Sequence, residues 1–182
     1  LVGRLNDKGA FKRFASALGV RTVAGLEAES VAALEAAIRR MAVGRQRLML
    51  RKVSYAGGAG NIQGAPEELL ARLPDWYNGG KVLVEPFLEI ASVAGSLASV
   101  GPEGLQFLGI DLQVIRDGGW AGFDYPYPEG PGATRVRDWT MRIAEAVRDS
   151  GARGYLNLDW AFLVDSPGAP VVLECNFRHN GL

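Results

Sequence analysis

The feature that most constrains the fold is a pair of apolar stretches near the C-terminus, residues 155–163 and 171–178, joined by a short polar segment. The joining segment, Asp165 to Pro170, consists of Asp, Ser, Pro, Gly and Ala, and most of these residue types are common in turns. Apolar stretches of this length on either side of a turn segment predict a β-hairpin. The chain should therefore end in two antiparallel strands.

The second of these strands alternates polar and apolar residues. Because successive side chains of a strand point to opposite sides, Glu174, Asn176 and Arg178 should share one side. Leu173 and Cys175 belong to the other side, which is apolar and suits a core. The polar side then carries a carboxylate, an amide and a guanidinium group in a row.

Asp159 of the first strand would add a second carboxylate if it points to the same side as Glu174. At about 4 Å two such charges repel by about 4 kcal/mol at an intermediate dielectric constant. A cation must then lie between them, or one must be protonated. The oxygens of Asp, Glu and Asn are ligands that Mg²⁺ prefers, together with phosphate oxygens. A solvated hairpin face whose acids pair with Arg178 explains these residues equally well.

Composition limits the class of protein. The 182 residues are 48% hydrophobic, enough for the core of one domain or two small lobes of a soluble globular protein. The 20 Lys and Arg residues balance 20 Asp and Glu, so no overall charge favours nucleic acid or an anionic membrane. A single Cys excludes an intrachain disulfide and, with a single His, argues against a zinc site, which fits a cytoplasmic protein.

The ends of the chain lead to two further expectations. No apolar run approaches the roughly 20 residues of a membrane span, and the N-terminus has no signal-peptide pattern. The chain starts without Met and stops soon after the polar strand, so we expect a fragment of a longer protein.

The other elements are expected from capping residues and apolar periodicity. We expect helices from Asp7 to Gly19, Ser30 to about Gly44, Pro66 to about Leu73 and Asp138 to Asp149, strands at 48–53, 81–86, 92–100 and 105–115, and an irregular loop at 118–131. The fold class is α+β, with mainly antiparallel sheets.

A second candidate site follows the strand that closes on Lys52. The loop that starts at Ser54 contains Gly57, Gly58 and Gly60, so its backbone can approach a ligand closely. Exposed backbone amides near an ammonium group commonly hold phosphate. The order differs from the GxxxxGK[ST] loop, because Lys52 precedes the glycines. A flexible hairpin tip explains the same residues.

A third candidate site surrounds the end of the strand at Pro86. Glu85 precedes the proline, and Phe87, Leu88 and Glu89 follow it. A carboxylate or carbonyl here can accept a hydrogen bond from an adenine amino group while the backbone amide of Leu88 donates to the ring. The alternative is an edge strand that the proline ends.

In their order along the chain, these motifs resemble the ATP-grasp superfamily over nearly the whole sequence. The resemblance rests on Asn6-Asp7-Lys8 at a helix start, Lys52 and the Gly-rich loop, Glu85-Pro86-Phe87-Leu88, Asp159, and the pattern Glu174-x-Asn176-x-Arg178. The last of these patterns is the most specific.

The resemblance implies a role for each matching residue. Lys8 and Lys52 would contact the phosphates of ATP, and the loop with Ser54, Gly57, Gly58 and Gly60 would fold over them. Glu85, Phe87 and Leu88 would lie at the adenine, with Glu89 near the ribose. Asp159, Glu174 and Asn176 would hold Mg²⁺ or Mn²⁺. Arg178 would act with Lys52 on the transferred phosphoryl group. His179 lies outside the matching pattern, and we expect it to be a polar neighbour rather than a base.

The resemblance also implies an architecture. Residues 1–20 and 90–182 would form a large lobe and residues 21–89 a small lobe, each an antiparallel sheet with outer helices, with the nucleotide between them. We expect the substrate domain that usually precedes such a chain to have no counterpart in this sequence.

The implied activity is an ATP-dependent ligase. It would activate a carboxylate as an acyl phosphate and join it to an amine, releasing ADP and phosphate, with amino acids or peptides as substrates and no nucleic acid or membrane partner. The sequence also resembles pheganomycin-type peptide ligases in its general character, without a specific motif. The alternatives are a biotin carboxylase-type subunit, which would activate bicarbonate, and a nucleotide-binding module without turnover.

Overall fold

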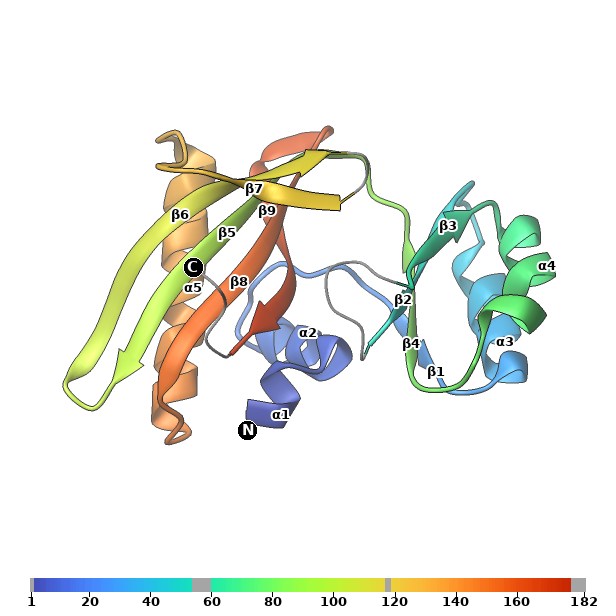
Figure 1. The fold of residues 1–182 in the computed structure, drawn as a ribbon, viewed down its shortest axis with the longest axis horizontal. Coiled ribbons are helices and arrows are strands. Elements are labelled where there is room, and N and C mark those ends of the chain that lie inside the picture. Colours follow the sequence, from blue (N-terminus) through green and yellow to red (C-terminus); the bar gives the residue numbers. More distant parts are fainter. Residues whose placement is uncertain (1, 54–59, 117–118, 178–182) are drawn as a thin grey trace. The chain divides into compact units, whose positions relative to one another are not determined.

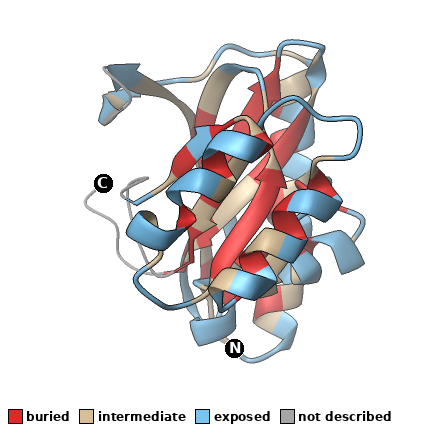
Figure 2. Ribbon diagram, turned by 90° about the vertical axis from the view of Figure 1, so that its right-hand side faces the viewer, coloured by how far each residue is buried: buried red, intermediate tan, exposed pale blue. Residues whose placement is uncertain are grey.

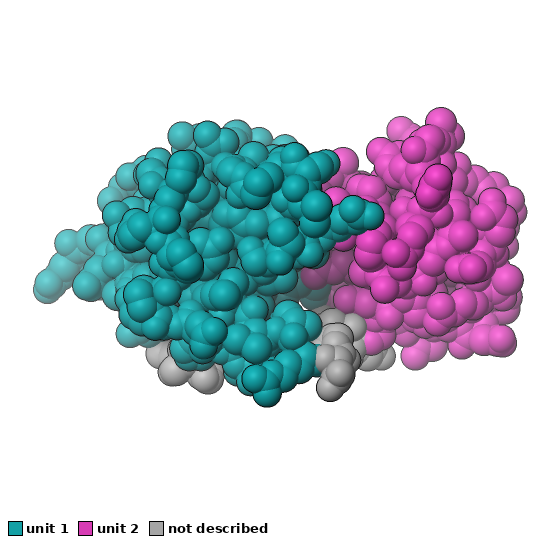
Figure 3. Space-filling model, turned by 90° about the horizontal axis from the view of Figure 1, so that it is seen from above, with its two compact units in different colours: residues 1–22, 89–182 teal, residues 23–88 magenta. Residues whose placement is uncertain are grey.

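A computed structural model describes residues 2–53, 60–116 and 119–177 (Figure 1). The chain divides into two compact units, one of residues 1–22 and 89–182 and the other of residues 23–88 (Figure 3). We call them unit 1 and unit 2. In the described parts of the chain, no helix is both long and apolar enough to cross a membrane.

Unit 2 contains a four-stranded antiparallel sheet in its described residues, in the order β1-β4-β2-β3. Its strands are β1 (Leu26–Ala28), β2 (Leu48–Lys52), β3 (Ile62–Gly64) and β4 (Val82–Pro86), and its helices are α3 (Val31–Met41) and α4 (Pro66–Trp76). Ser30 caps α3 by accepting a hydrogen bond from the amide of Ala33 at 3.2 Å. Leu34 and Ile38 of α3 pack with Leu69 of α4 over the sheet.

Unit 1 contains a five-stranded antiparallel sheet in its described residues, in the order β7-β6-β5-β8-β9 (Figure 1). Its strands are β5 (Ile90–Gly101), β6 (Gly104–Arg116), β7 (Gly119–Asp124), β8 (Gly154–Leu163) and β9 (Ser166–Asn176), and its helices are α1 (Val2–Leu5), α2 (Lys8–Ala17) and α5 (Pro131–Asp149). The expected C-terminal hairpin is confirmed as β8 and β9, and so is the α+β class.

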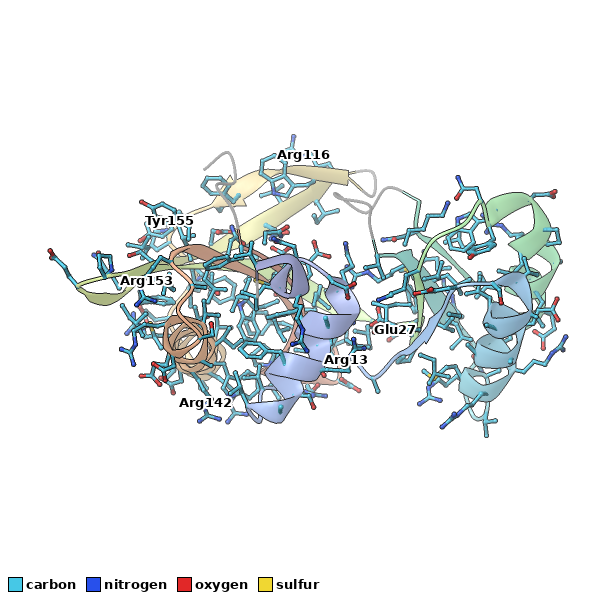
Figure 4. All side chains as sticks on the ribbon, turned by 90° about the horizontal axis from the view of Figure 1, so that it is seen from below. Arg13, Glu27, Arg116, Arg142, Arg153 and Tyr155 are labelled. Atoms are coloured by element: carbon cyan, nitrogen blue, oxygen red, sulfur yellow. The ribbon has the colours of Figure 1, made fainter. Side chains whose placement is uncertain are left out.

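Helices α2 and α5 contribute to one core with the sheet of unit 1. The helices α3 and α4 of unit 2, which face the viewer in Figure 2, show the corresponding pattern: buried residues lie on the sides that face strands, and exposed residues lie on the outer sides. Trp160 of β8 is fully buried and donates a 2.8 Å hydrogen bond to the Ser96 hydroxyl, which contacts that of Thr140 on α5 at 2.7 Å. Arg142 of α5 reaches the end of α2, where it donates to the carbonyl oxygen of Leu18 at 3.2 Å (Figure 4).

The predicted irregular loop at 118–131 is wrong in part. Residues Gly119–Asp124 form β7, which pairs with β6, and α5 begins at Pro131 rather than at Asp138. Gly, Pro and Tyr residues hid a strand that contains Trp120 and Phe123, two residue types that favour strands. Pro131 occupies the first turn of α5, where its missing amide hydrogen costs nothing.

Candidate functional site

Strands β8 and β9 bring the predicted metal residues to one side of the sheet of unit 1. Asp159 lies directly opposite Glu174, and Asn157 lies directly opposite Asn176. Directly opposite residues of antiparallel strands point to the same side. All four side chains therefore share one face, and buried Leu158 points to the other. We call this the polar face.

Two amide groups hold the Asp159 carboxylate. Gln113 of β6 donates to its Oδ1 at 2.7 Å, and Asn176 of β9 donates to its Oδ2 at 3.3 Å. The Asn176 nitrogen is used in this contact, so its amide oxygen points to a different side. Gln113 is absent from the residues predicted from the sequence. Its position in a strand gave no signal, because its neighbour Asp159 is 46 residues away.

Lys8 and Glu174, both predicted site residues, form an ion pair with an Nζ to Oε2 distance of 3.5 Å. Both side chains are mostly buried, 10% and 18% exposed. Lys8 is the first residue of α2, and Asp7 caps the helix by accepting from the amide of Ala10 at 2.8 Å. Asn6 accepts a hydrogen bond from the amide of Phe177 at 2.9 Å. The start of α2 is thus fastened to the end of β9.

One detail of the predicted alternation is wrong. Leu173 was expected in the core, but the pairing of β8 with β9 shifts register so that Trp160 is opposite Val172. The extra residue of this β-bulge is Leu173, which is only partly buried, whereas Val172 and Cys175 belong to the core. The bulge lies next to the predicted metal residues.

A third carboxylate continues the row of Asp159 and Glu174 across the sheet. Asp111 of β6 lies opposite Gly95 of β5, which lies opposite Asp159. Gly95 donates its amide hydrogen to Asp111 Oδ1 at 3.2 Å. A Cβ atom at Gly95 would lie 2.6 and 2.8 Å from the two carboxylate oxygens, so any larger residue here would displace the Asp111 side chain. Burial raises the pKa of Asp111 above 3.8. The sequence did not single out this residue.

The donors of the polar face fit a divalent cation. Asp159 and Glu174 supply carboxylate oxygens and Asn176 an amide oxygen, the set that Mg²⁺ takes with phosphate oxygens. The buried Oδ1 of Asn157 has no hydrogen-bond partner in the described part of the chain, as expected of a group that awaits a ligand. In the same part of the chain, no three His, Cys, Asp or Glu side chains form a metal cluster by themselves.

Cys175 is buried on the apolar side of β9, with 4% of its surface exposed. Burial raises the pKa of its thiol, and the nearby charges of Asp159 and Glu174 raise it further. A thiol kept protonated is a poor nucleophile.

In unit 2, Lys52 lies at the end of β2 and is 7% exposed. Its ammonium group donates to Asn78 Oδ1 at 2.5 Å and lies 5.0 Å from the ring centre of Trp76. Alternation along β2 places Lys52 on the side of the buried Leu48 and Leu50.

Glu85 lies on the other side of the same sheet, opposite Met49 of β2. It is 3% exposed and pairs with Arg51 at 3.6 Å. The structure therefore brings Glu85 together with Arg51 and not with Lys52. Phe87, which follows β4, is covered by the guanidinium carbon of Arg47 at 4.0 Å.

The remaining predicted residues divide into described and undescribed ones. Gly60 is exposed, has a φ of 75° that favours glycine, and accepts a hydrogen bond from the Trp76 indole at 3.1 Å. Leu88 ends unit 2, whereas Glu89 begins the second segment of unit 1. The other four, Ser54, Gly57, Gly58 and Arg178, lie outside the described residues, as does His179.

Comparison with known proteins identifies the fold. No protein-family model matches the sequence, and no curated protein is similar to it. A carboxyaminoimidazole ribonucleotide synthase from Aspergillus clavatus, complexed with ATP, has a TM-score of 0.79 at 14% identity, covering 97% of this chain and 46% of that chain. VanG D-Ala:D-Ser ligase from Enterococcus faecalis has a TM-score of 0.77 at 17% identity, covering 95% and 52%.

A third solved structure is the biotin carboxylase domain of a 2-oxoglutarate carboxylase from Hydrogenobacter thermophilus, in complex with MgADP, ADP and bicarbonate. Its TM-score is 0.77 at 16% identity, covering 97% of this chain and 40% of that chain. The chain thus spans about half of the length of the structures it matches. Similarity at this level of identity establishes the fold.

Proposed function

The chain has the ATP-grasp fold, and we propose that it is the nucleotide-binding part of an ATP-dependent ligase that activates a carboxylate as an acyl phosphate and joins it to an amine. Unit 1 would be the large lobe of this enzyme and unit 2 the small lobe. The observation that carries the proposal is the polar face, where Asp159, Glu174 and Asn176 lie side by side with Lys8 paired to Glu174.

The residues of the polar face would act by binding and orientation. Asp159 and Glu174, with the amide oxygen of Asn176, would hold a magnesium ion, which when bound supplies positive charge to the phosphate oxygens. Lys8 lies next to this set, paired with Glu174, and would contact a phosphate of the nucleotide. Fixed charges of this kind stabilise the charge that develops during phosphoryl transfer.

The other predicted site residues complete the proposal. Lys52 would contact a second phosphate, and Ser54, Gly57, Gly58 and Gly60 would cover it. Glu85, Phe87 and Leu88 would bind the adenine and Glu89 the ribose. Arg178 would face the transferred phosphoryl group. Cys175 takes no part, because it is buried on the other side of β9 with its thiol protonated.

The substrate class is proposed from the reactions for which the structural relatives are named. The structural relatives include enzymes named for joining D-Ala to D-Ser and for forming a carboxyaminoimidazole, so a small carboxylic acid and an amine are the substrate class we propose here. An amino acid or peptide would supply one or both groups. The single Cys of the chain, which is buried, suits the cytoplasm.

Nucleotide binding tests the metal assignment. We expect MgADP to raise the melting temperature of the protein. At an MgADP concentration a hundred times its dissociation constant, binding adds about 2.7 kcal/mol to the free energy of unfolding. The double variant Glu174→Ala/Asn176→Ala should lose this shift. The matched control is Glu103→Ala/Gln106→Ala, which also removes one Glu and one amide side chain, from exposed positions in the turn before β6 and at the start of β6. An equal shift in both double variants would reject the metal assignment.

Turnover separates the ligase from the alternatives. ADP release should depend on a carboxylic acid and an amine supplied together. The biotin carboxylase-type alternative is favoured by one structural relative, which was crystallised with MgADP and bicarbonate. It predicts ADP release that depends on bicarbonate and biotin. Binding of MgADP without ADP release under any pairing would indicate a binding module.

A further inference from the structure

Asp111 is a half-buried carboxylate on the polar face without a positively charged partner in the described part of the chain. Its side chain lies over Gly95, whose amide donates to it at 3.2 Å. A carboxylate taken partly out of water normally requires a cation or several donors. The Asp111 carboxylate accepts hydrogen bonds only from two backbone amides in the described part of the chain, that of Gly95 and its own. The chain thus holds a carboxylate in place for a positive group that its described residues do not supply.

One aromatic side chain shares the polar face with this carboxylate, and a second covers the nearby Gly109. Phe123 of β7 is directly opposite Gln113 of β6, so it points to the polar face, and it is 44% exposed. Tyr125 follows β7 and covers Gly109, where a Cβ atom would lie 2.9 Å from the tyrosine ring. Tyr125 is 65% exposed. Gly109 lies on the polar face, two residues before Asp111.

Phe123 and Asp111 are diagonal neighbours in the pairing of β6 with β7. Diagonal neighbours on one face of an antiparallel pair lie about 7–8 Å apart, which aromatic and long side chains can bridge. The apolar surface continues along the same hairpin through Ile115 and Trp120, which are opposite each other and 48% and 59% exposed. Arg116 marks the end of β6 (Figure 4).

We propose that Asp111, Phe123 and Tyr125 form a subsite for an ammonium group, carried by an amine substrate with an apolar side chain. The carboxylate supplies a charged hydrogen-bond acceptor, and the ring faces attract a cation while covering apolar carbon. This inference rests on the proposed ligase function, of which it specifies the amine.

The position of the subsite fits this role. Asp111 is separated from Asp159 by the single strand β5, so the two lie about 10 Å apart across the sheet. An amine held at Asp111 is therefore on the same face as the proposed metal residues, at a distance that a substrate can span. The Asp111 carboxylate covers Gly95, the residue that lies between Asp111 and Asp159 in the sheet, so it extends toward Asp159.

Two matched probes test the subsite. 2-Phenylethylamine and 2-phenylethanol have the same ring and chain, but only the first carries an ammonium group at neutral pH. We expect the protein to bind the amine about tenfold more tightly or better, since a hydrogen bond to a charged group contributes that much. Binding is measured by calorimetry or ligand-observed NMR, with and without MgADP.

Two variants locate the interaction. Asp111→Asn keeps the shape of the side chain and an oxygen for Gly95, and it should remove the preference for the amine. Asp124→Asn is the control, because Asp124 lies opposite Leu112 on the other face of the same hairpin and is also exposed. Phe123→Leu should weaken binding of the amine several-fold and keep part of the preference.

The outcomes separate this inference from the proposed function. Equal binding of the two probes, no binding of the amine at millimolar concentration, or equal effects of the two Asp variants would overturn the subsite, while MgADP binding would leave the proposed function standing. Failure of the wild-type protein to bind MgADP would instead reject the proposed function, and with it the assignment of the subsite to a ligase substrate.

Discussion

Gln113 and Asp159 show how a single side chain can set the geometry of the site. The 2.7 Å hydrogen bond from Gln113 fixes one carboxylate oxygen of Asp159, while Asn176 contacts the other. A carboxylate that is held in one orientation presents its free lone pairs in a constant direction. Partners of this kind commonly change metal affinity by about 10–100-fold when they are removed.

We therefore expect Gln113→Met, which keeps the length of the side chain but removes the donor, to weaken magnesium-dependent ADP binding by about 10–100-fold. The measurement is a Mg²⁺ titration at fixed ADP by calorimetry. Gln106→Met is the control, since Gln106 is exposed on the same strand. Unchanged Mg²⁺ affinity in Gln113→Met would show that Gln113 does not orient Asp159.

Cys175 gives a second prediction at this scale. Because burial and two neighbouring carboxylates raise the pKa of its thiol, the thiolate is scarce at neutral pH. A thiol reagent such as Ellman's reagent should react slowly with the native protein and at an ordinary rate in urea. Rapid reaction of the native protein would place the thiol at the surface.

At the residue scale the sequence predicted contacts that alternation along one strand determines. Glu174 and Asn176 share a face because they are two residues apart, and Asp159 joins them through the neighbouring strand of the hairpin. Gln113 escaped prediction because its partner Asp159 lies 46 residues away, and Asp111 because its partner is the backbone amide of Gly95, a residue without a side chain to signal the contact. Leu173 was misplaced because a bulge, which depends on pairing with β8, is invisible in one strand.

Among the elements, α2 carries the most information about the site. Its first residue, Lys8, is a cation at the helix end where the backbone dipole disfavours positive charge. The Glu174 carboxylate at 3.5 Å offsets this effect. The position of Lys8 therefore depends on where α2 begins, and this is set by the cap at Asp7.

We expect Asp7→Ala to lower the free energy of unfolding by about 1 kcal/mol, the usual effect of losing an N-cap. Asp7→Ser, which restores a capping oxygen, should recover most of it. Urea denaturation followed by circular dichroism provides the measurement. If the Ala and Ser variants are equally destabilised, the capping hydrogen bond is not the source of the stability.

The elements that the sequence predicted are those with strong local signals. Helix α2 has a cap, apolar periodicity and Gly19 with a φ of 72° at its end. Strand β7 was missed because its stability depends on pairing with β6 more than on its own composition. Strands β1 and β3 have three residues each, too few for a periodic pattern.

At the scale of the whole molecule, two cores support two sheets, and each sheet carries part of the proposed site. The cores are separate sets of residues, with Trp160 and Phe11 in unit 1 and Leu50 and Leu69 in unit 2. The order of strands in each sheet could not be read from the sequence, because β4 pairs with both β1 and β2 across intervening helices. The resemblance to a known superfamily predicted two antiparallel sheets with outer helices, but not the order of their strands.

The pH dependence of global stability tests whether Asp111 is buried as described. Its pKa in the folded protein lies above 3.8, so the folded state keeps this proton at pH values where the unfolded chain has released it. Stability from this group is therefore fully present below pH 3.8 and is lost as the pH rises through the folded-state pKa.

The variant Asp111→Asn cannot titrate at this position. The unfolding free energy of the wild type minus that of the variant should fall over this window and stay constant at higher pH. Urea denaturation of both proteins from below pH 3.8 to neutrality measures the difference, and parallel curves would mean that Asp111 is as solvated in the folded state as in the unfolded one.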